Sequence, residues 1–296
     1  MSTEITNNAE SLHTNVKYTG FDIDIEHLKR EMATLQPNFK IEIRKEIGGK
    51  LNAGKEMVYT LPFTKSQTEN NYFFNSFQAT LKRPGMEDLS TEFYADQRIT
   101  AREAFNLLEG RAVEKKYNRH EKLEQDGKTV FKPIKDDTYM AWRKIDFTDT
   151  DARGNFKLQS FGEGYGFKFE EKLANVPLKL PLDDDTKKDL KKGEVISVMF
   201  AKENNTIKGY LEVNPRIWNF NTYDADLKAI PDINKRLSQG LTNEGPAESH
   251  AKNVTNDLSD QSQKQGKKED NKNNLSVEKD AVEKKTGKKK SAGIRH

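Results

Sequence analysis

The sequence contains no cysteine, and this absence excludes several classes of protein. Disulfide-stapled folds, thiolate nucleophiles and cysteine-based zinc or iron–sulfur sites all need the missing thiol. No apolar run approaches the roughly 20 residues that a membrane-spanning helix needs. The N-terminal residues also lack the basic segment and apolar run of a secretory signal. We therefore expect a cytoplasmic protein that does not engage a membrane.

Aromatic residues are missing from both ends of the 296-residue chain, since the first is Tyr18 and the last is Tyr223. Hydrophobic residues make up only 33% of the chain and charged residues another 33%, so part of it cannot bury enough surface to fold. Because aromatic side chains dominate core burial, we expect a folded region at residues 19–235, as one domain or two closely packed subdomains. Residues 1–18 are predicted to be a disordered lead-in, and residues 236–296 a long disordered, lysine-rich tail.

The positive charge is concentrated in the predicted tail. Residues 251–296 hold twelve basic and seven acidic residues, a net +5, so the rest of the chain carries −2 of the total +3. Basic side chains that neutralise phosphates give salt-sensitive binding to DNA or RNA without sequence preference. A solubilising role for the tail is the alternative. The candidate nucleic-acid contacts in the tail are Lys284, Lys285, Lys288, Lys289, Lys290 and Arg295.

The most strongly patterned segment is ITAREAFNLLEGRAV, residues 99–113. Thr100 and Glu103 have the spacing of a capping box, and Gly110 stands where a left-handed residue commonly ends a helix. Phe105 and Leu108 share one face of the predicted helix, so we expect them in the core rather than in a site.

Elsewhere the pattern alternates between strands and short helices. Leu28, Met32 and Leu35 predict one face of an early helix, and residues 72–81 and 89–94 predict a hairpin around Pro84-Gly85. Further strands are expected at 39–47, 56–63, 111–117, 128–134, 139–147, 156–161, 195–200 and 206–213. A charged loop is expected between the strands at 111–117 and 128–134. With no regular βαβ alternation, these elements favour an α+β fold of mixed antiparallel hairpins and a few short helices.

Five segments in this order resemble a family of uncharacterised proteins: NYFFNSFQATLKRP, ITAREAFNLLEGRAV, YMAWRKIDF, GNFKLQSFGEGYGF and YLEVNPRIWNFNTYD. The family is found on conjugative transposons and other mobile elements of Bacteroidota. The resemblance covers roughly residues 23–230. It implies a mobile-element setting, and it brings no catalytic residue to this chain.

The residues that could carry chemistry form no recognised constellation. The five histidines lack H-E-x-x-H or comparable spacing, and Asp183, Asp184 and Asp185 are interpreted as the capped start of a helix. The GYGF segment matches the centre of an RNA-binding box, which makes Tyr165 and Phe167 candidate base-stacking residues. Glu163 stands where that box needs a basic residue, so packing of both rings on the core is the competing interpretation.

These observations favour a non-enzymatic accessory protein of a mobile genetic element, with no cofactor and no metal. It would act as a protein-interaction module for an unknown protein partner, with non-specific DNA or RNA contact through the basic tail. The first alternative is a nucleic-acid-binding domain that exposes Trp142, Tyr165 and Trp218 on a sheet. The second is an enzyme whose acid–base groups come from distant segments.

Overall fold

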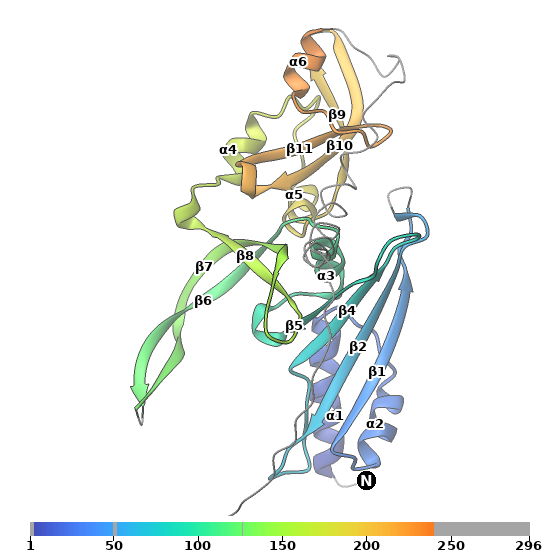
Figure 1. Cartoon of the computed structure of the whole chain (residues 1–296), viewed down its shortest axis with the longest axis vertical. Coiled ribbons are helices and arrows are strands. Elements are labelled where there is room, and N and C mark those ends of the chain that lie inside the picture. The colour runs from blue at the N-terminus through green and yellow to red at the C-terminus, as the bar shows by residue number, and fades with distance from the viewer. Residues whose placement is uncertain (1–2, 50–51, 126, 240–296) are drawn as a thin grey trace, which may run out of the picture.

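The computed structural model describes residues 3–49, 52–125 and 127–239 (Figure 1). The first half contains α1 (Thr3–Tyr18), α2 (Ile25–Ala33), β1 (Asn38–Glu46), β2 (Glu56–Lys65), β3 (Tyr72–Phe73), β4 (Ser76–Lys82), β5 (Leu89–Tyr94), η2 (Ala95–Gln97) and α3 (Ala101–Leu108). The second half contains β6 (Val113–Gln125), β7 (Lys128–Thr150), β8 (Phe156–Gly162), η3 (Glu163–Tyr165), α4 (Phe169–Ala174), α5 (Asp184–Lys191), β9 (Ile196–Lys202), β10 (Asn205–Asn214), η4 (Pro215–Ile217), β11 (Asn219–Asp224) and α6 (Ile233–Ser238). Every strand pair is antiparallel, which confirms the predicted α+β class.

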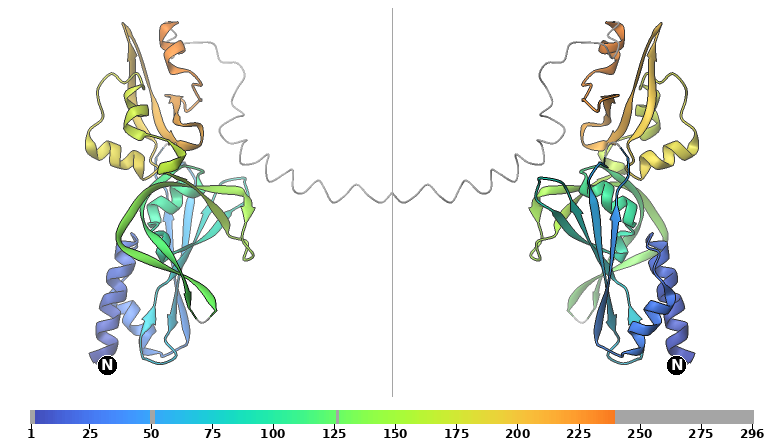
Figure 2. Two further views of the ribbon diagram at one scale, coloured as in Figure 1. Left: turned by 90° about the vertical axis from the view of Figure 1, so that its left-hand side faces the viewer. Right: turned by 90° about the vertical axis from the view of Figure 1, so that its right-hand side faces the viewer.

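The first half is a sheet of order β1-β2-β4-β5, with β3 paired to β2. Alternation along β2 buries Met57, Tyr59, Leu61 and Phe63 on one face. Helices α1, α2 and α3 contribute to the same hydrophobic cluster as that face, which we call the first core. Figure 2 shows α1 running alongside this sheet at the N-terminal end of the molecule.

The prediction of a disordered lead-in at residues 1–18 is wrong for α1. Ala9, Leu12 and Val16 follow helical spacing and are buried in the first core. The Asn8 side chain also accepts from the Tyr72 backbone N–H at 2.7 Å, which ties the helix to β3. The aromatic limits missed this helix because it buries only small and aliphatic side chains.

The C-terminal part of the second half, from α4 to α6, is a sheet of order β11-β10-β9 with α4, α5 and α6 around it. A separate hydrophobic cluster, the second core, joins these elements. Leu237 of α6 is fully buried there, so the predicted start of the tail at residue 236 is too early. Residues 240–296 lie outside the described residues.

A third sheet, β6-β7-β8, connects the two cores. Ile145 of β7 belongs to the first core, whereas Trp142 of the same strand belongs to the second. The expected charged loop before residues 126–127 is wrong, because β6 continues to Gln125. The two strands predicted at 128–134 and 139–147 are one long strand, β7. Charged side chains do not interrupt a strand whose two faces both meet solvent.

The first half also differs from the sequence-based predictions in two smaller ways. The first predicted hairpin arm is broken, because β3 pairs with β2 while β4 pairs with both β2 and β5. Leu35 lies beyond the end of α2 with φ 55° and is exposed, so only Leu28 and Met32 of the predicted face are buried.

Helix α3 is confirmed in detail and lies between the two stacked halves (Figures 1 and 2). The Thr100 hydroxyl accepts from the Glu103 backbone N–H, and the Glu103 carboxylate accepts from the Thr100 N–H at 2.9 Å. Phe105 and Leu108 are fully buried. Gly110 ends the helix with φ 78°.

Candidate interaction surface

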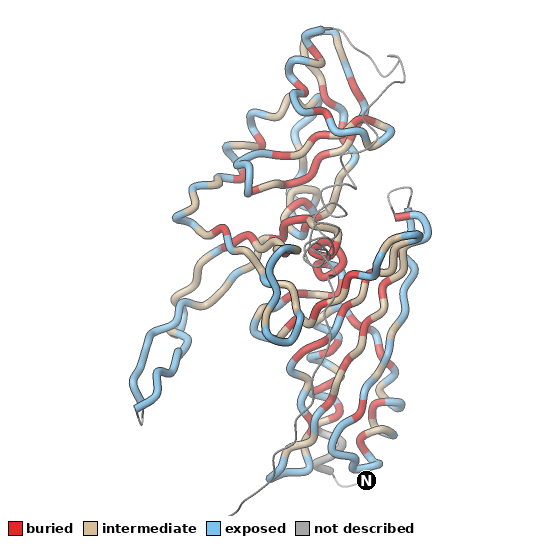
Figure 3. The backbone as a smooth tube through the Cα atoms, viewed as in Figure 1, coloured by how far each residue is buried: buried red, intermediate tan, exposed pale blue. Residues whose placement is uncertain are grey.

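The most prominent feature outside the two cores is a long two-stranded arm, formed by residues 113–125 of β6 and 128–143 of β7. Figure 1 shows it projecting away from the body of the molecule, and Figure 3 shows that its outer part is exposed throughout. Strand β8 pairs with β7 only from Ala141 onward. The outer arm is therefore a two-stranded ribbon, which in water has little stability of its own.

A bulge divides the arm into an inner and an outer part. Asn118 pairs with Thr138 and His120 pairs with Pro133, so residues 134–137 of β7 stand opposite a single residue of β6. Asp136 in this bulge has φ 62°, a left-handed conformation that aspartate tolerates better than most residues. Such bulges bend a ribbon and increase its twist.

The outer arm exposes apolar side chains on both faces. Phe131 is 65% exposed, Val130 40% and Leu123 38%. Leu123 lies opposite Val130, and Phe131 lies opposite Lys122. Because directly opposed residues share a face and neighbours alternate, Leu123 and Val130 occupy one face while Phe131 occupies the other. Neither face is covered by another described part of the chain.

The inner arm, in contrast, contacts the body as well as packing on itself. The Arg119 guanidinium lies 3.3 Å from the Asp137 carboxylate and 3.1 Å from that of Glu163, and it stacks 5.1 Å from the Tyr139 ring. Tyr117 donates to Gln97 O at 3.3 Å. Burial raises the pKa of the Tyr117 hydroxyl. The arm therefore has a base that contacts the body and an end that does not.

A second exposed group of aromatic side chains follows the arm base. Tyr165 of η3 packs edge-on against Phe161 and Trp218, at 4.8 and 5.6 Å between ring centroids, and its hydroxyl donates to Arg216 O at 3.0 Å. Trp218 is 48% exposed and has φ 56°, which is rare for a bulky residue. The neighbouring Ile217 is exposed as well. Half-exposed tryptophan beside tyrosine and arginine has the composition of an interaction anchor.

The aromatic residues singled out from the sequence are distributed differently. Phe167 is partly buried and packs against the second core, where its ring lies 5.7 Å from that of the buried Trp142. Tyr165 is half-buried in the group just described. The structure thus brings Tyr165 and Trp218 together at the surface and keeps Trp142 inside. The six basic residues of the tail, from Lys284 to Arg295, lie outside the described residues.

Buried and partly buried charged side chains gather around α3, and most of them were not predicted from the sequence. Glu103 accepts from Lys115 Nζ at 2.8 Å, and Glu109 accepts from Lys55 Nζ at 2.6 Å. Arg111 donates to Asn106 Oδ1 at 2.8 Å and stacks on the Phe105 ring. Each carboxylate is therefore paired with a cation from a different element of the fold.

This polar network also joins the two halves. The Asn106 amide donates to Lys192 O at 2.8 Å and to Glu194 at 3.1 Å. Although burial favours the neutral acid, hydrogen bonds from Arg102 and Asn106 hold the pKa of Glu194 below its usual value. Gly193 permits this contact, because a Cβ there would lie 2.9 Å from the Ala112 carbonyl oxygen.

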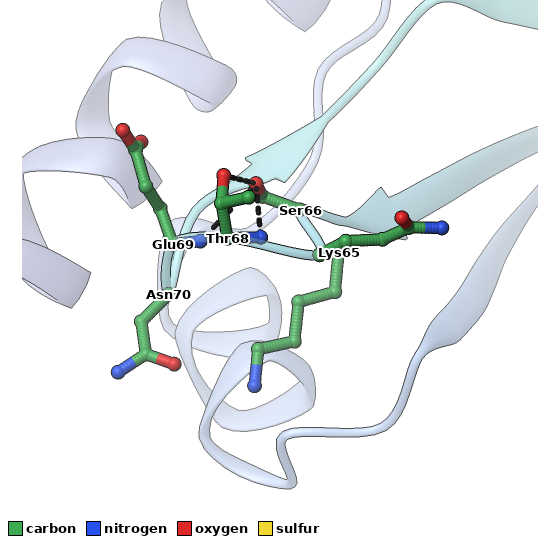
Figure 4. A pocket seen from close by; sticks show the side chains of 6 residues that line it. Lys65, Ser66, Thr68, Glu69 and Asn70 are labelled. Atoms are coloured by element: carbon green, nitrogen blue, oxygen red, sulfur yellow. Dashed lines mark hydrogen bonds between the residues drawn. The ribbon is translucent and has the colours of Figure 1, made fainter.

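The described residues add little support for a metal site or a small-molecule site. Asp183 caps α5 by accepting from the Thr186 N–H at 2.7 Å, as the sequence predicts. Among the described residues, no three His, Asp or Glu side chains gather as metal ligands would. A hollow of about 190 Å³ lies within the turn at residues 65–70 (Figure 4). Ser66 organises that turn by accepting from the Thr68 and Glu69 N–H groups, so the hollow is the inside of one polar turn.

Within the described ranges, none of the helices is both long and apolar enough to cross a bilayer. The chain matches no protein-family model, no curated protein and no solved structure.

Proposed function

We propose that this chain is a protein-interaction module that reaches its partner with the β6–β7 arm. The observation that carries the proposal is the outer arm, which exposes Leu123, Val130 and Phe131 on a ribbon whose base contacts Glu163 through Arg119. Apolar side chains on both faces of a narrow ribbon gain little from folding, but they gain burial on binding. The resemblance of the sequence to mobile-element proteins supports an accessory, non-enzymatic role in such an element.

Contact with DNA or RNA through the basic tail is a second part of the proposal. Its support is the net +5 of residues 251–296 on a chain whose remainder carries −2. A body of that charge offers no general attraction for phosphates, so binding would depend on the tail. Stacking of bases on Trp218 is the alternative, and the exposure of its ring beside Arg216 supports it.

A photo-crosslinking amino acid at position 131 tests the interaction role directly. In cells that carry the natural gene, we expect crosslinks from this position to one protein of defined mass. The control is the same amino acid at Leu180, which is 72% exposed and lies outside the arm. Equal crosslinking from both positions, or crosslinks to nucleic acid alone, would contradict the proposal.

The tail is tested in the full-length chain by changing its six candidate basic residues to glutamine. We expect DNA and RNA binding at low salt to weaken strongly and its salt dependence to flatten, because fewer counterions are released. The matched comparison is Trp218→Ala with the tail intact. If Trp218→Ala removes binding and the tail variant does not, the body is the nucleic-acid reader.

A further inference from the structure

We propose that the partner of the arm is a second copy of this chain, whose β6 adds antiparallel to β6 of the first copy about a two-fold axis at His120. This inference rests on the proposed function of the arm and names its partner. Strand β6 is the outermost strand of its sheet, with β7 as its one strand neighbour among the described residues. An open strand edge is a template for another strand.

Two contacts indicate which backbone groups of β6 face the open edge. Lys116 O accepts from the exposed Arg98 side chain at 3.4 Å, so this carbonyl points away from β7, and Arg98 has to move aside for a strand that adds there. His120 lies opposite Pro133, which has no N–H to donate across the ladder. Along an antiparallel strand, residues whose backbone N–H and C=O groups bond to the neighbouring strand alternate with residues whose backbone groups point away from it. Both contacts therefore indicate that the backbone N–H and C=O groups of the even-numbered residues from 116 to 124 point away from β7.

The charges of β6 are self-complementary in the register centred on His120. There, Lys116 of one copy faces Glu124 of the other, and Arg119 faces Glu121. Each pair occurs twice, because a two-fold contact is isologous. Cross-strand pairs of opposite charge stabilise a sheet, and like charges directly opposite destabilise it.

Two neighbouring registers keep the same residues facing the second copy, but they place like charges opposite each other. A shift in one direction centres the contact on Arg119, which then faces its own copy, and brings Lys116 against Lys122. A shift in the other direction sets Glu121 against Glu121. The charge pattern thus selects one register of three.

The same register also covers part of the exposed apolar surface. Leu123 of one copy faces Tyr117 of the other, and the strand partners of these residues are Val130 and Tyr139. The rings of Tyr117 and Tyr139 lie 5.9 Å apart and are only partly buried. The apolar end of each arm would therefore rest against the tyrosine pair at the base of the other arm.

Charge reversal in the full-length chain tests the pairing, with sedimentation over a concentration series as the measurement. We expect a dimer whose dissociation constant rises about tenfold or more in Lys116→Glu and in Glu124→Lys, because each change breaks two pairs and creates like-charge contacts. Combining both changes in one chain remakes the pairs with opposite polarity and should restore the dimer. The matched control is Lys45→Glu, which alters an exposed lysine on β1.

A chain that stays monomeric at every concentration overturns the inference, and so does a double variant that dimerises no better than the single ones. Unchanged circular dichroism, and an unchanged melting temperature at a dilution where the natural chain is monomeric, show that folding is intact. The crosslinker at position 131 separates this failure from failure of the arm itself. A monomeric chain that still crosslinks to a different protein leaves the arm as the interaction site and removes the second copy as its partner.

Discussion

Arg102 of α3 and Glu194, just before β9, form a two-pronged ion pair between the two halves of the molecule. Arg102 Nε donates to Oε1 of Glu194 and Nη2 donates to Oε2. This geometry matches the planar guanidinium to the carboxylate. The Arg102 side chain is half-exposed, so solvent screens the pair.

A double-mutant cycle on Arg102→Ala and Glu194→Ala measures this link. We expect a coupling energy of about 1 kcal/mol in the free energy of unfolding, because the pair is fixed at both ends but partly screened. Urea denaturation of the four proteins gives the value. Additive effects of the two substitutions would show that the halves are held together without this pair.

The lowered pKa of Glu194 predicts a pH dependence. A carboxyl group whose folded pKa lies below the ordinary 4.5 contributes stability that is present above pH 4.5 and lost as the pH falls through the folded value. The stability difference between the natural chain and Glu194→Gln should therefore be constant near neutrality and shrink below pH 4.5. Urea denaturation across an acid pH series measures it. A difference that grows on acidification would reverse the assigned sign.

Removing the Glu103 carboxylate should be costly. Glu103→Ala leaves the Thr100 N–H without its capping partner and Lys115 without its counterion at a site where Glu103 is 5% exposed. We expect a loss of about 3 kcal/mol in the free energy of unfolding. Glu103→Gln, which keeps an acceptor for the cap, should lose less. Glu10→Ala, at an exposed position of α1, is the control with no expected effect on stability.

At Gly209 of β10, the fold leaves no room for a side chain, and the surrounding sequence does not indicate this. A Cβ at this position would lie 2.1 Å from the Tyr223 carbonyl oxygen of β11 and 2.9 Å from the Phe200 ring. Gly209→Ala must therefore separate β10 from β11, at about 3 kcal/mol or more. Gly164→Ala, where a Cβ would meet nothing within 4 Å, should change stability by less than about 0.5 kcal/mol. Thermal melting of both variants compares them, and equal melting temperatures would refute the steric argument.

Local signals predicted local structure well. The capping box at Thr100 and Glu103 and the Asp183 cap both appear as the sequence indicates, because each depends on residues within one helical turn. The same signals could not find α1, whose buried face is aliphatic, nor the outer arm, whose charged residues resemble those of a loop.

Only some residues of the candidate interaction surface could be predicted from the sequence. Tyr165 was singled out from its GYGF context, but its neighbour in space, Trp218, follows 53 positions later and is brought to it by the β10–β11 connection. Phe167, from the same motif, turns instead toward the second core. Motif spacing carries no information about which ring of a short segment faces inward.

The amino-acid sequence by itself determined the α+β class, the central helix with its caps and the uneven charge along the chain, because these follow from composition and from contacts a few residues apart. Only the tertiary structure decided that β6 and β7 run out together as an arm, that two cores meet at α3, and that Arg102 finds Glu194. Those features depend on contacts between residues far apart in the chain, where burial and strand pairing across the whole fold outweigh local preference.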